Sequence, residues 1–380
     1  MYTLKRATTT EGATLPEPVI VPTDPASTFT NSTAAGINRV VALSPDLLLV
    51  NNIGRNCELW HFDSAGGFRQ QAVFNTTIFP GEDFPSIFDL DAHAAFLADG
   101  GATLLLCNHY GLVRCFDLAA TEAGSLTVAA TLSLPGDTER LLLAQGCLIA
   151  SSPRGQYTPE PAEPGILISE RLPRLADVRG REIALGYELG LRDWGMVTAL
   201  ATNAAQRLLA VGAAERIGVF ALESREHGLR LGRCLWERRI PYLPQWTGFD
   251  GAARLIVAGY DATLDDPAGI DWDALGRGGF DAYSLGGDLL LRASLPDETA
   301  WGYGADPIAP SADYRHLYAI DRRAGLHAVS TLTGEGRQIY DGIDAPESLG
   351  IGHAETIHGS LFAGFSRGGY RLCRYGLSAS

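Results

Sequence analysis

Short runs of alternating apolar and polar residues recur along the whole chain. One of them, LVRCFD at residues 112–117, leads into the polar stretch LAATEAG at 118–124. Strict alternation of this kind is typical of a β-strand with one buried face. Comparable runs end at seven positions that are 46 to 63 residues apart: Asp63, Asp117, Ser169, Ala221, Ser284, Ser330 and Gly376. Such regular recurrence indicates a repeat architecture of seven units.

Each run follows another short apolar run, such as LLLV at 47–50, and further strand candidates flank most of them. Four short strands per unit, joined by glycine-rich turns and with almost no helical periodicity, predict the blade of a β-propeller. We therefore expect an all-β fold, a seven-bladed propeller of four-stranded antiparallel blades, as a single domain over residues 1–380. The expected blades are 37–76, 86–135, 139–186, 195–240, 246–296, 301–341 and 349–380.

Two of the runs end in an aromatic residue followed by aspartate, at Phe62-Asp63 and Phe116-Asp117. These pairs resemble the Trp-Asp that ends the third strand of WD40 blades. Over its whole length the chain resembles the WD40 and YVTN-type seven-bladed propellers, and no more specific family is identified. A tandem of two-sheet sandwiches is the alternative architecture that also gives many short strands.

The last unit lacks residues for its outer strand, because only four residues follow Gly376. We expect the N-terminal arm, residues 1–36, to supply that strand and close the ring. PVIV at 18–21 and YTLKR at 2–6 are the two candidate segments. A strand flanked by prolines suits an outer edge, where a missing backbone donor costs little.

Composition and charge narrow the classes of partner. The net charge of −14 repels phosphate backbones and anionic lipid, so neither a nucleic acid nor a membrane surface is an expected partner. No apolar run approaches a membrane span, and the first residues lack the apolar core of a signal peptide, which favours a cytoplasmic protein. The six scattered cysteines are expected to be buried free thiols.

The lengths of the predicted loops differ between the two faces of the propeller. The turns expected on one face are short, whereas the other face, here called the top face, carries long and varied connections. These begin at residues 79, 151, 187, 240, 260 and 296. Because loops carry most functional residues, we expect the top face to be the working surface.

Three top-face connections end in a tryptophan, at Trp194, Trp246 and Trp301, where inner strands are expected to begin. Such rings would surround the mouth of the central channel and bind a partner protein or a small-molecule ligand. The remaining rim candidates are Arg154, Tyr157, Arg192, Tyr242 and Tyr303. In the alternative interpretation, the three tryptophans only pack blade against blade.

Two further segments suggest an enzyme as the alternative function. Asp91 and His93 share one strand face, as do His353 and Glu355, and both segments are expected to be inner strands. Converging in the channel, they would form a metal site or act as general acid and base in a lactonase-like hydrolase, lyase or isomerase. No cofactor is predicted, although a divalent metal in the channel is an option for this set.

Overall fold

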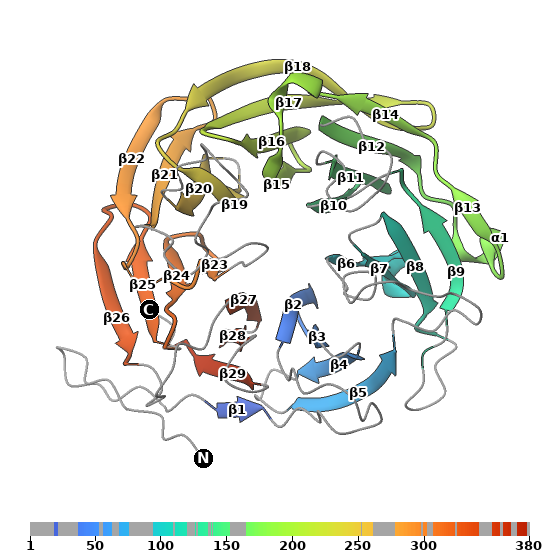
Figure 1. Ribbon diagram of the computed structural model, residues 1–380, viewed down its shortest axis with the longest axis horizontal. Helices are drawn as coiled ribbons and strands as arrows, with labels where there is room; N and C mark the ends of the chain where they lie inside the picture. Colours follow the sequence, from blue (N-terminus) through green and yellow to red (C-terminus); the bar gives the residue numbers. More distant parts are fainter. Residues whose placement is uncertain are drawn as a thin grey trace. The chain divides into compact units, whose positions relative to one another are not determined.

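The computed structural model describes residues 19–21, 37–52, 56–62, 68–75, 94–108, 111–119, 126, 128–135, 138, 140–152, 165–251, 253–260, 278–297, 299–301, 307–323, 325–341, 352–357, 360–365 and 371–377 (Figure 1). Strands dominate these residues, with one short helix, α1 (Leu175–Val178), and two 3-10 segments, η2 (Asp99–Gly101) and η3 (Arg192–Trp194). None of the helices described has the length and apolar character needed to cross a bilayer. The chain divides into two compact units, residues 1–69, 258–282 and 290–380 in unit 1, and residues 70–257 and 283–289 in unit 2.

Unit 1 is built from sheets whose strands follow one another in sequence. One has the order β2-β3-β4-β5, with bounds Ile37–Ser44, Leu47–Asn52, Asn56–Phe62 and Phe68–Asn75; all of β5 after Arg69 belongs to unit 2. A second has the order β23-β24-β25-β26, with bounds Ile308–Pro310, His316–Ile320, Leu326–Ser330 and Gly336–Tyr340. A third combines β27 (Gly352–Ile357), β28 (Ser360–Phe365) and β29 (Arg371–Gly376) with the N-terminal strand β1 (Val19–Val21).

Strand β1 is the outer strand of the third sheet. It pairs antiparallel with β29, with Ile20 opposite Cys373 and Val21 opposite Leu372. Of the two segments that the sequence offered for this position, the one at 18–21 is confirmed.

Deleting residues 1–25, which removes β1, is expected to lower the melting temperature by about 5 °C. The reason is that three paired residues are lost at roughly 1 kcal/mol per backbone hydrogen bond, and the edge of β29 becomes exposed. Differential scanning calorimetry of the full and shortened chains measures the change. An unchanged melting curve would show that β1 adds nothing to the stability of this sheet.

Unit 2 begins with β6 (Ala94–Ala98), β7 (Thr103–Cys107), β8 (Leu112–Asp117) and β9 (Val128–Ser133), to which β13 (Glu182–Ala184) adds a fifth, parallel strand. An eight-stranded sheet follows. One half contains β10 (Leu141–Ala144), β11 (Cys147–Ser152), β12 (Gly165–Arg171) and β14 (Tyr187–Gly190). The other half contains β15 (Val197–Asn203), β16 (Leu208–Ala213), β17 (Arg216–Arg225) and β18 (Gly228–Arg239). A single residue pair, Glu170 with Gly228, joins the two halves.

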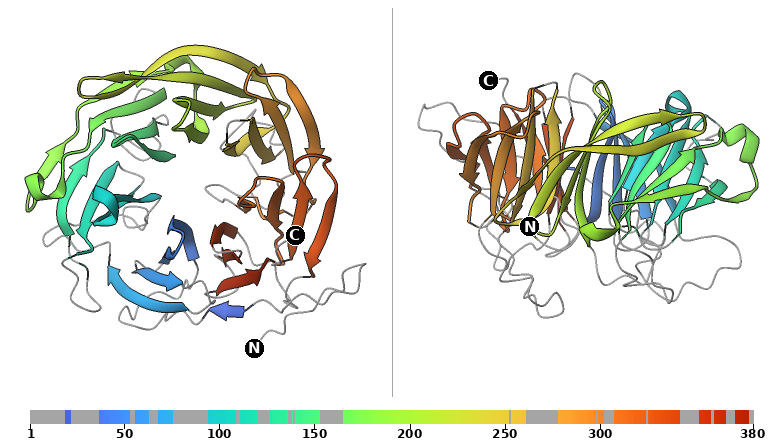
Figure 2. Two further views of the ribbon diagram at one scale, coloured as in Figure 1. Left: turned by 180° about the vertical axis from the view of Figure 1, so that it is seen from behind. Right: turned by 90° about the horizontal axis from the view of Figure 1, so that it is seen from above.

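The remaining sheet has the order β19-β20-β21-β22, with bounds Leu243–Asp250, Arg254–Tyr260, Gly278–Ser284 and Leu289–Ser294. Its residues are divided between the two units. Figure 2 shows the long hairpin of β17 and β18 from two sides, with β18 running along the outside of β17.

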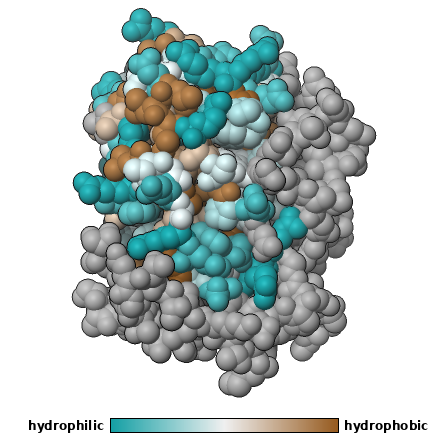
Figure 3. All heavy atoms as spheres, turned by 90° about the vertical axis from the view of Figure 1, so that its left-hand side faces the viewer, coloured by the Kyte–Doolittle hydropathy of each residue, from teal (hydrophilic) through white to brown (hydrophobic). Residues whose placement is uncertain are grey.

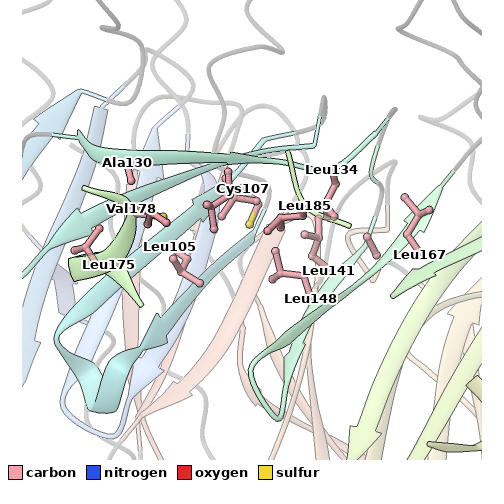
Figure 4. Close-up of a cluster of buried hydrophobic side chains, with 14 residues drawn as sticks. Leu105, Cys107, Ala130, Leu134, Leu141, Leu148, Leu167, Leu175, Val178 and Leu185 are labelled. Carbon is pink, nitrogen blue, oxygen red and sulfur yellow. The ribbon is translucent and has the colours of Figure 1, made fainter. Parts of the chain in front are cut away.

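Burial along the strands explains why these segments form layers. The middle strands β7 (TLLLC) and β16 (LLAVGA) are buried at every residue, whereas β22 (LLLRAS) is half-buried or exposed throughout. A strand covered on both faces requires an unbroken apolar run. In unit 2, leucines of β7, β11 and β12 pack together, and Leu175 and Val178 of α1 extend the same core (Figure 4).

Unit 1 has cores of its own that join strands from different sheets. The rings of Phe62 (β4) and Phe362 (β28) lie 4.6 Å apart, and those of Tyr340 (β26) and Tyr375 (β29) lie 5.3 Å apart. Aromatic pairs at such distances contribute packing area and a preferred tilted geometry. The sheets of unit 1 are therefore held together by direct contacts between their buried faces.

Candidate functional site

Trp194 lies in η3 and is buried, with 8% of its surface exposed. Its ring meets Phe220 edge-on at a centroid distance of 5.2 Å, and the Arg216 guanidinium carbon lies 4.5 Å above it. A Cβ atom at Gly218 would come within 2.5 Å of the ring, so glycine is needed in β17 for this approach. In this arrangement the ring is a packing group between η3 and β17.

The other two tryptophans differ from each other. Trp301 is 3% exposed, contacts Tyr260 in a tilted arrangement with ring centroids 5.7 Å apart, and directs its indole nitrogen at Gly278. Trp246 lies inside β19, not before it, and is half-buried. Of the three rings expected at the channel mouth, Trp246 is the one that the structure leaves partly open to solvent.

The remaining binding candidates are placed as follows. Tyr242 is 6% exposed and its hydroxyl donates to the carbonyl oxygen of Val257, at 3.0 Å, which makes it part of the core around β19 and β20. Arg192 is exposed in η3, next to Trp194. Arg154, Tyr157 and Tyr303 lie outside the described residues, and their binding role stays a prediction.

The catalytic candidates are not brought together in the described part of the chain. Asp91 and His93 lie outside it, and His353 and Glu355 belong to β27 but their side chains are not described. Among the described residues, no group of three or more histidine, cysteine, aspartate or glutamate side chains is placed to hold a metal ion. The enzyme alternative and its metal therefore stay predictions.

Arg140 ties together three inner strands of unit 2 and was not singled out by the sequence. Its guanidinium donates to the carbonyl oxygens of Thr198 (2.7 Å) and Gln245 (3.1 Å), and to the side-chain oxygen of Gln245. Arg140 directly precedes β10, while Thr198 and Gln245 lie near the starts of β15 and β19. One side chain therefore fixes the spacing of three strands beside Trp246.

A pocket of about 360 Å³ lies where β12, β14 and the β17–β18 hairpin meet. Strand β14 pairs with Ile166 to Ser169 of β12, and the hairpin continues along the same edge through Glu170 and Gly228. The pocket, here called the hairpin pocket, is lined by Ile168, Ser169, Glu170, Tyr187, Glu188, Arg225, Glu226, His227, Gly228 and Leu229.

Charged and aromatic side chains dominate the open part of the hairpin pocket. Three carboxylates, Glu170, Glu188 and Glu226, face one guanidinium, that of Arg225, which leaves a net charge of −2 when His227 is neutral. Arg225 forms an ion pair with Glu188. Within the described part of the chain, Glu170 and Glu226 form no ion pair.

The backbone fixes the floor of the hairpin pocket. The amide of Glu170 donates to the carbonyl oxygen of Gly186, and the amide of Arg171 donates to that of His227, both at 2.8 Å. A Cβ atom at Gly186 would lie 2.6 Å from the carboxyl carbon of Glu170, so this side chain rests directly against the β14 end of the pocket. The side chain of Arg171 instead lies against Gly146, away from the pocket lining.

The sequence did not reveal this pocket, because ESREHG at 223–228 looks like an ordinary solvated hairpin turn. The turn belongs to the set of short turns, not to the top face where function was expected. YELGLRDWG at 187–195 was expected to be a connecting loop, yet its first four residues form β14. Within the sequence, Tyr187 and Glu188 are about 40 residues away from Arg225 and Glu226, and only the fold brings the two segments together.

Two other features of the surface and core are relevant to chemistry. Leu290 of β22 and Leu332, which follows β25, are 55% and 59% exposed, and Figure 3 shows apolar atoms among polar ones on the side of the molecule that carries β22 and β26. Of the cysteines described, Cys57, Cys107, Cys115 and Cys147 are buried, as expected, whereas Cys234 is exposed. Burial raises the pKa of the Cys107 thiol strongly and that of Cys115 to about 12.

These raised pKa values predict a loss of stability at alkaline pH. An unfolded thiol ionises near pH ~8.5, so above that pH the unfolded chain loses a proton that the folded chain retains. The stabilisation that each buried thiol provides is complete below pH ~8.5. Above that pH, the free energy of unfolding falls by up to about 1.4 kcal/mol per pH unit for each thiol, as the pH rises toward the folded-state pKa. Urea unfolding between pH 8 and 10 should show a shallower decline for Cys115→Ala than for the unmodified chain. Parallel curves for the two proteins would contradict this assignment.

Comparisons with known proteins identify the fold. No family profile matches the sequence. No curated protein matches it either. Among solved structures, the chain is similar to the β-propeller domain of Cps50 (Swd1) from Myceliophteria thermophila, with a TM-score of 0.59, 11% identity, and coverage of 95% of this chain and 100% of that one. The expected all-β propeller fold is thereby confirmed.

Proposed function

We propose that this protein is a binding protein whose β-propeller holds a partner protein or a small-molecule ligand. The observation that carries the proposal is the hairpin pocket, whose volume of about 360 Å³ lies within the usual range of ligand sites, about 300–1,000 Å³. Its lining side chains are mostly exposed and differ in chemistry, as recognition requires. The propeller fold itself is compatible with many functions, so the argument depends on this site.

Native mass spectrometry of the purified full chain, followed by identification of what co-purifies, is the test. Tyr187→Ala, which removes the exposed ring of the hairpin pocket, is expected to lose the bound material while the protein still folds. Glu223→Gln is the matched control, because Glu223 lies on the same hairpin but pairs with Arg230 outside the pocket. Unchanged retention in Tyr187→Ala would refute the hairpin pocket as the binding site.

The top face is the second place where binding is proposed. Trp246 is the best reporter there, since Trp194 and Trp301 are buried and their removal would damage packing. If bound material is lost in Trp246→Ala and retained in Tyr187→Ala, the working surface is the top face and the channel mouth. A folded Trp246→Ala protein that retains its ligand would instead remove this ring from the site.

We also propose that the strands form seven blades. In support, the two halves of the eight-stranded sheet share one residue pair only, Glu170 with Gly228, and each half has four strands. Counting the halves separately, together with the five other sheets, gives seven groups. A cryo-electron microscopy or crystal structure would decide the number.

A further inference from the structure

We propose that the hairpin pocket takes a cationic group, either a guanidinium or an ammonium carried on an extended chain. This inference rests on the proposed binding function and names the chemistry of its ligand. A basic side chain of a partner peptide and a free polyamine share this chemistry. The experiment below separates these two sources.

The first argument is the charge of the lining. Three carboxylates surround the pocket and only Glu188 has a cation beside it, while Glu170 and Glu226 form no ion pair within the described part. The carboxylate of Glu170 is held against the backbone at Gly186, which fixes its place at one end of the pocket. An entering cation would meet carboxylates on β12 and on the hairpin together. An anion would meet a net charge of −2.

The second argument is the aromatic wall. Tyr187 is 48% exposed, lines the hairpin pocket, and lies at the start of β14 opposite Ser169 of β12. A cation near a tyrosine face gains an attraction that glutamates alone do not give. Carboxylates combined with an open aromatic ring favour an organic cation over a bare metal ion, which prefers a shell of oxygen ligands.

The third argument is that the pocket already holds one guanidinium of its own. Arg225 reaches from the end of β17 to Glu188 on β14, and both side chains are about half exposed. A guanidinium therefore fits beside the Glu188 carboxylate in the lining of the pocket. An external cation would occupy the remaining carboxylates, or compete with Arg225 for this one.

Saturation-transfer difference NMR on the full chain at low ionic strength tests the proposal with two probes. Spermidine represents a free polyamine, and the capped peptide acetyl-Gly-Arg-Gly-amide represents a basic side chain. The same peptide with citrulline in place of arginine is the uncharged control. Binding of the arginine peptide alone identifies a peptide side chain as the occupant, and binding of spermidine alone identifies a polyamine.

Variants of the lining give the expected pattern of affinities. Glu170→Gln and Glu226→Gln should each weaken binding about threefold, as expected for the loss of one solvent-exposed charge interaction. Tyr187→Ala should weaken it and Tyr187→Phe should restore it. Arg225→Gln removes the internal competitor and should strengthen binding, which a purely structural role for Arg225 would not produce. Glu223→Gln should leave the affinity unchanged.

Three results would overturn the proposal: equal binding of the citrulline peptide, unchanged affinity in Glu170→Gln and Glu226→Gln, or no signal from either cation at millimolar concentration. In each case the proposed binding function is judged separately, by the material that co-purifies and its loss in Tyr187→Ala. If the protein co-purifies with an uncharged or anionic ligand that is lost in Tyr187→Ala, the proposal of a cationic ligand is refuted and the proposed binding function is supported.

Discussion

Replacing Trp194 with alanine should lower the free energy of unfolding by about 4 kcal/mol, the usual cost of truncating a large buried aromatic side chain. The ring is 8% exposed, packs on Phe220, and lies under the Arg216 guanidinium. Its removal would leave a cavity beside β17 that the sheet cannot fill without moving Gly218. Urea unfolding followed by circular dichroism measures the effect.

Two further variants separate packing from a binding role at Trp194. Trp194→Phe keeps a ring against Phe220. Its loss in free energy of unfolding should therefore be less than half of that in Trp194→Ala. Trp246→Ala, at a half-buried position, should cost clearly less than Trp194→Ala. A Trp194→Ala protein with wild-type stability that no longer binds its partner would establish the ring as a contact residue.

Replacing Arg292 with leucine should destabilise the protein by about 3 kcal/mol, because it breaks an ion pair whose carboxylate, that of Asp281, is buried. Asp281 lies in β21 with its side chain fully buried, and Arg292 of β22 contacts both of its oxygens at 2.8 Å. The expected cost is at the low end for a buried pair, since the arginine is itself half exposed.

The charge can be tested separately from the packing. Adding Asp281→Asn to Arg292→Leu removes the buried charge and should recover part of the lost stability, measured by the same urea unfolding. Arg230→Leu breaks the exposed pair with Glu223 and should cost about 1 kcal/mol or less. A double variant no more stable than Arg292→Leu alone would rule out the buried charge of Asp281 as the cause.

Local pattern predicted the strands well where burial alternates or is continuous along them. The run at 112–117 is β8 itself, Leu112–Asp117, and the PVIV segment contains β1. Residues 172–190 were harder, because β13 pairs in parallel with β9, a strand about 50 residues earlier. The strand with which β13 pairs depends on which sheet has an open edge, and the local pattern of apolar and polar residues does not show this.

The sequence singled out aromatic residues such as Trp194, but it did not show which residues surround them. Trp194 packs against Gly218 and Phe220, which are more than twenty residues away, so its burial depends on strand register. The hairpin pocket is lined by both Tyr187 and Glu226, although each is unremarkable within its own segment. Sites built from three strands appear only when the pairing of those strands is known.

The pairing of β1 with β29 has a consequence for the order of events during synthesis. Ile20 is made about 350 residues before its partner Cys373, which at 5–20 residues per second is a delay of roughly 20 to 70 seconds. During that interval β1 emerges from the ribosome without its partner and must remain unpaired while the intervening sheets form. The sheet of β1 and β29 can be completed only after β29 has been translated, so ribosome stalling before β29 would leave β1 open to pairing with another nascent chain.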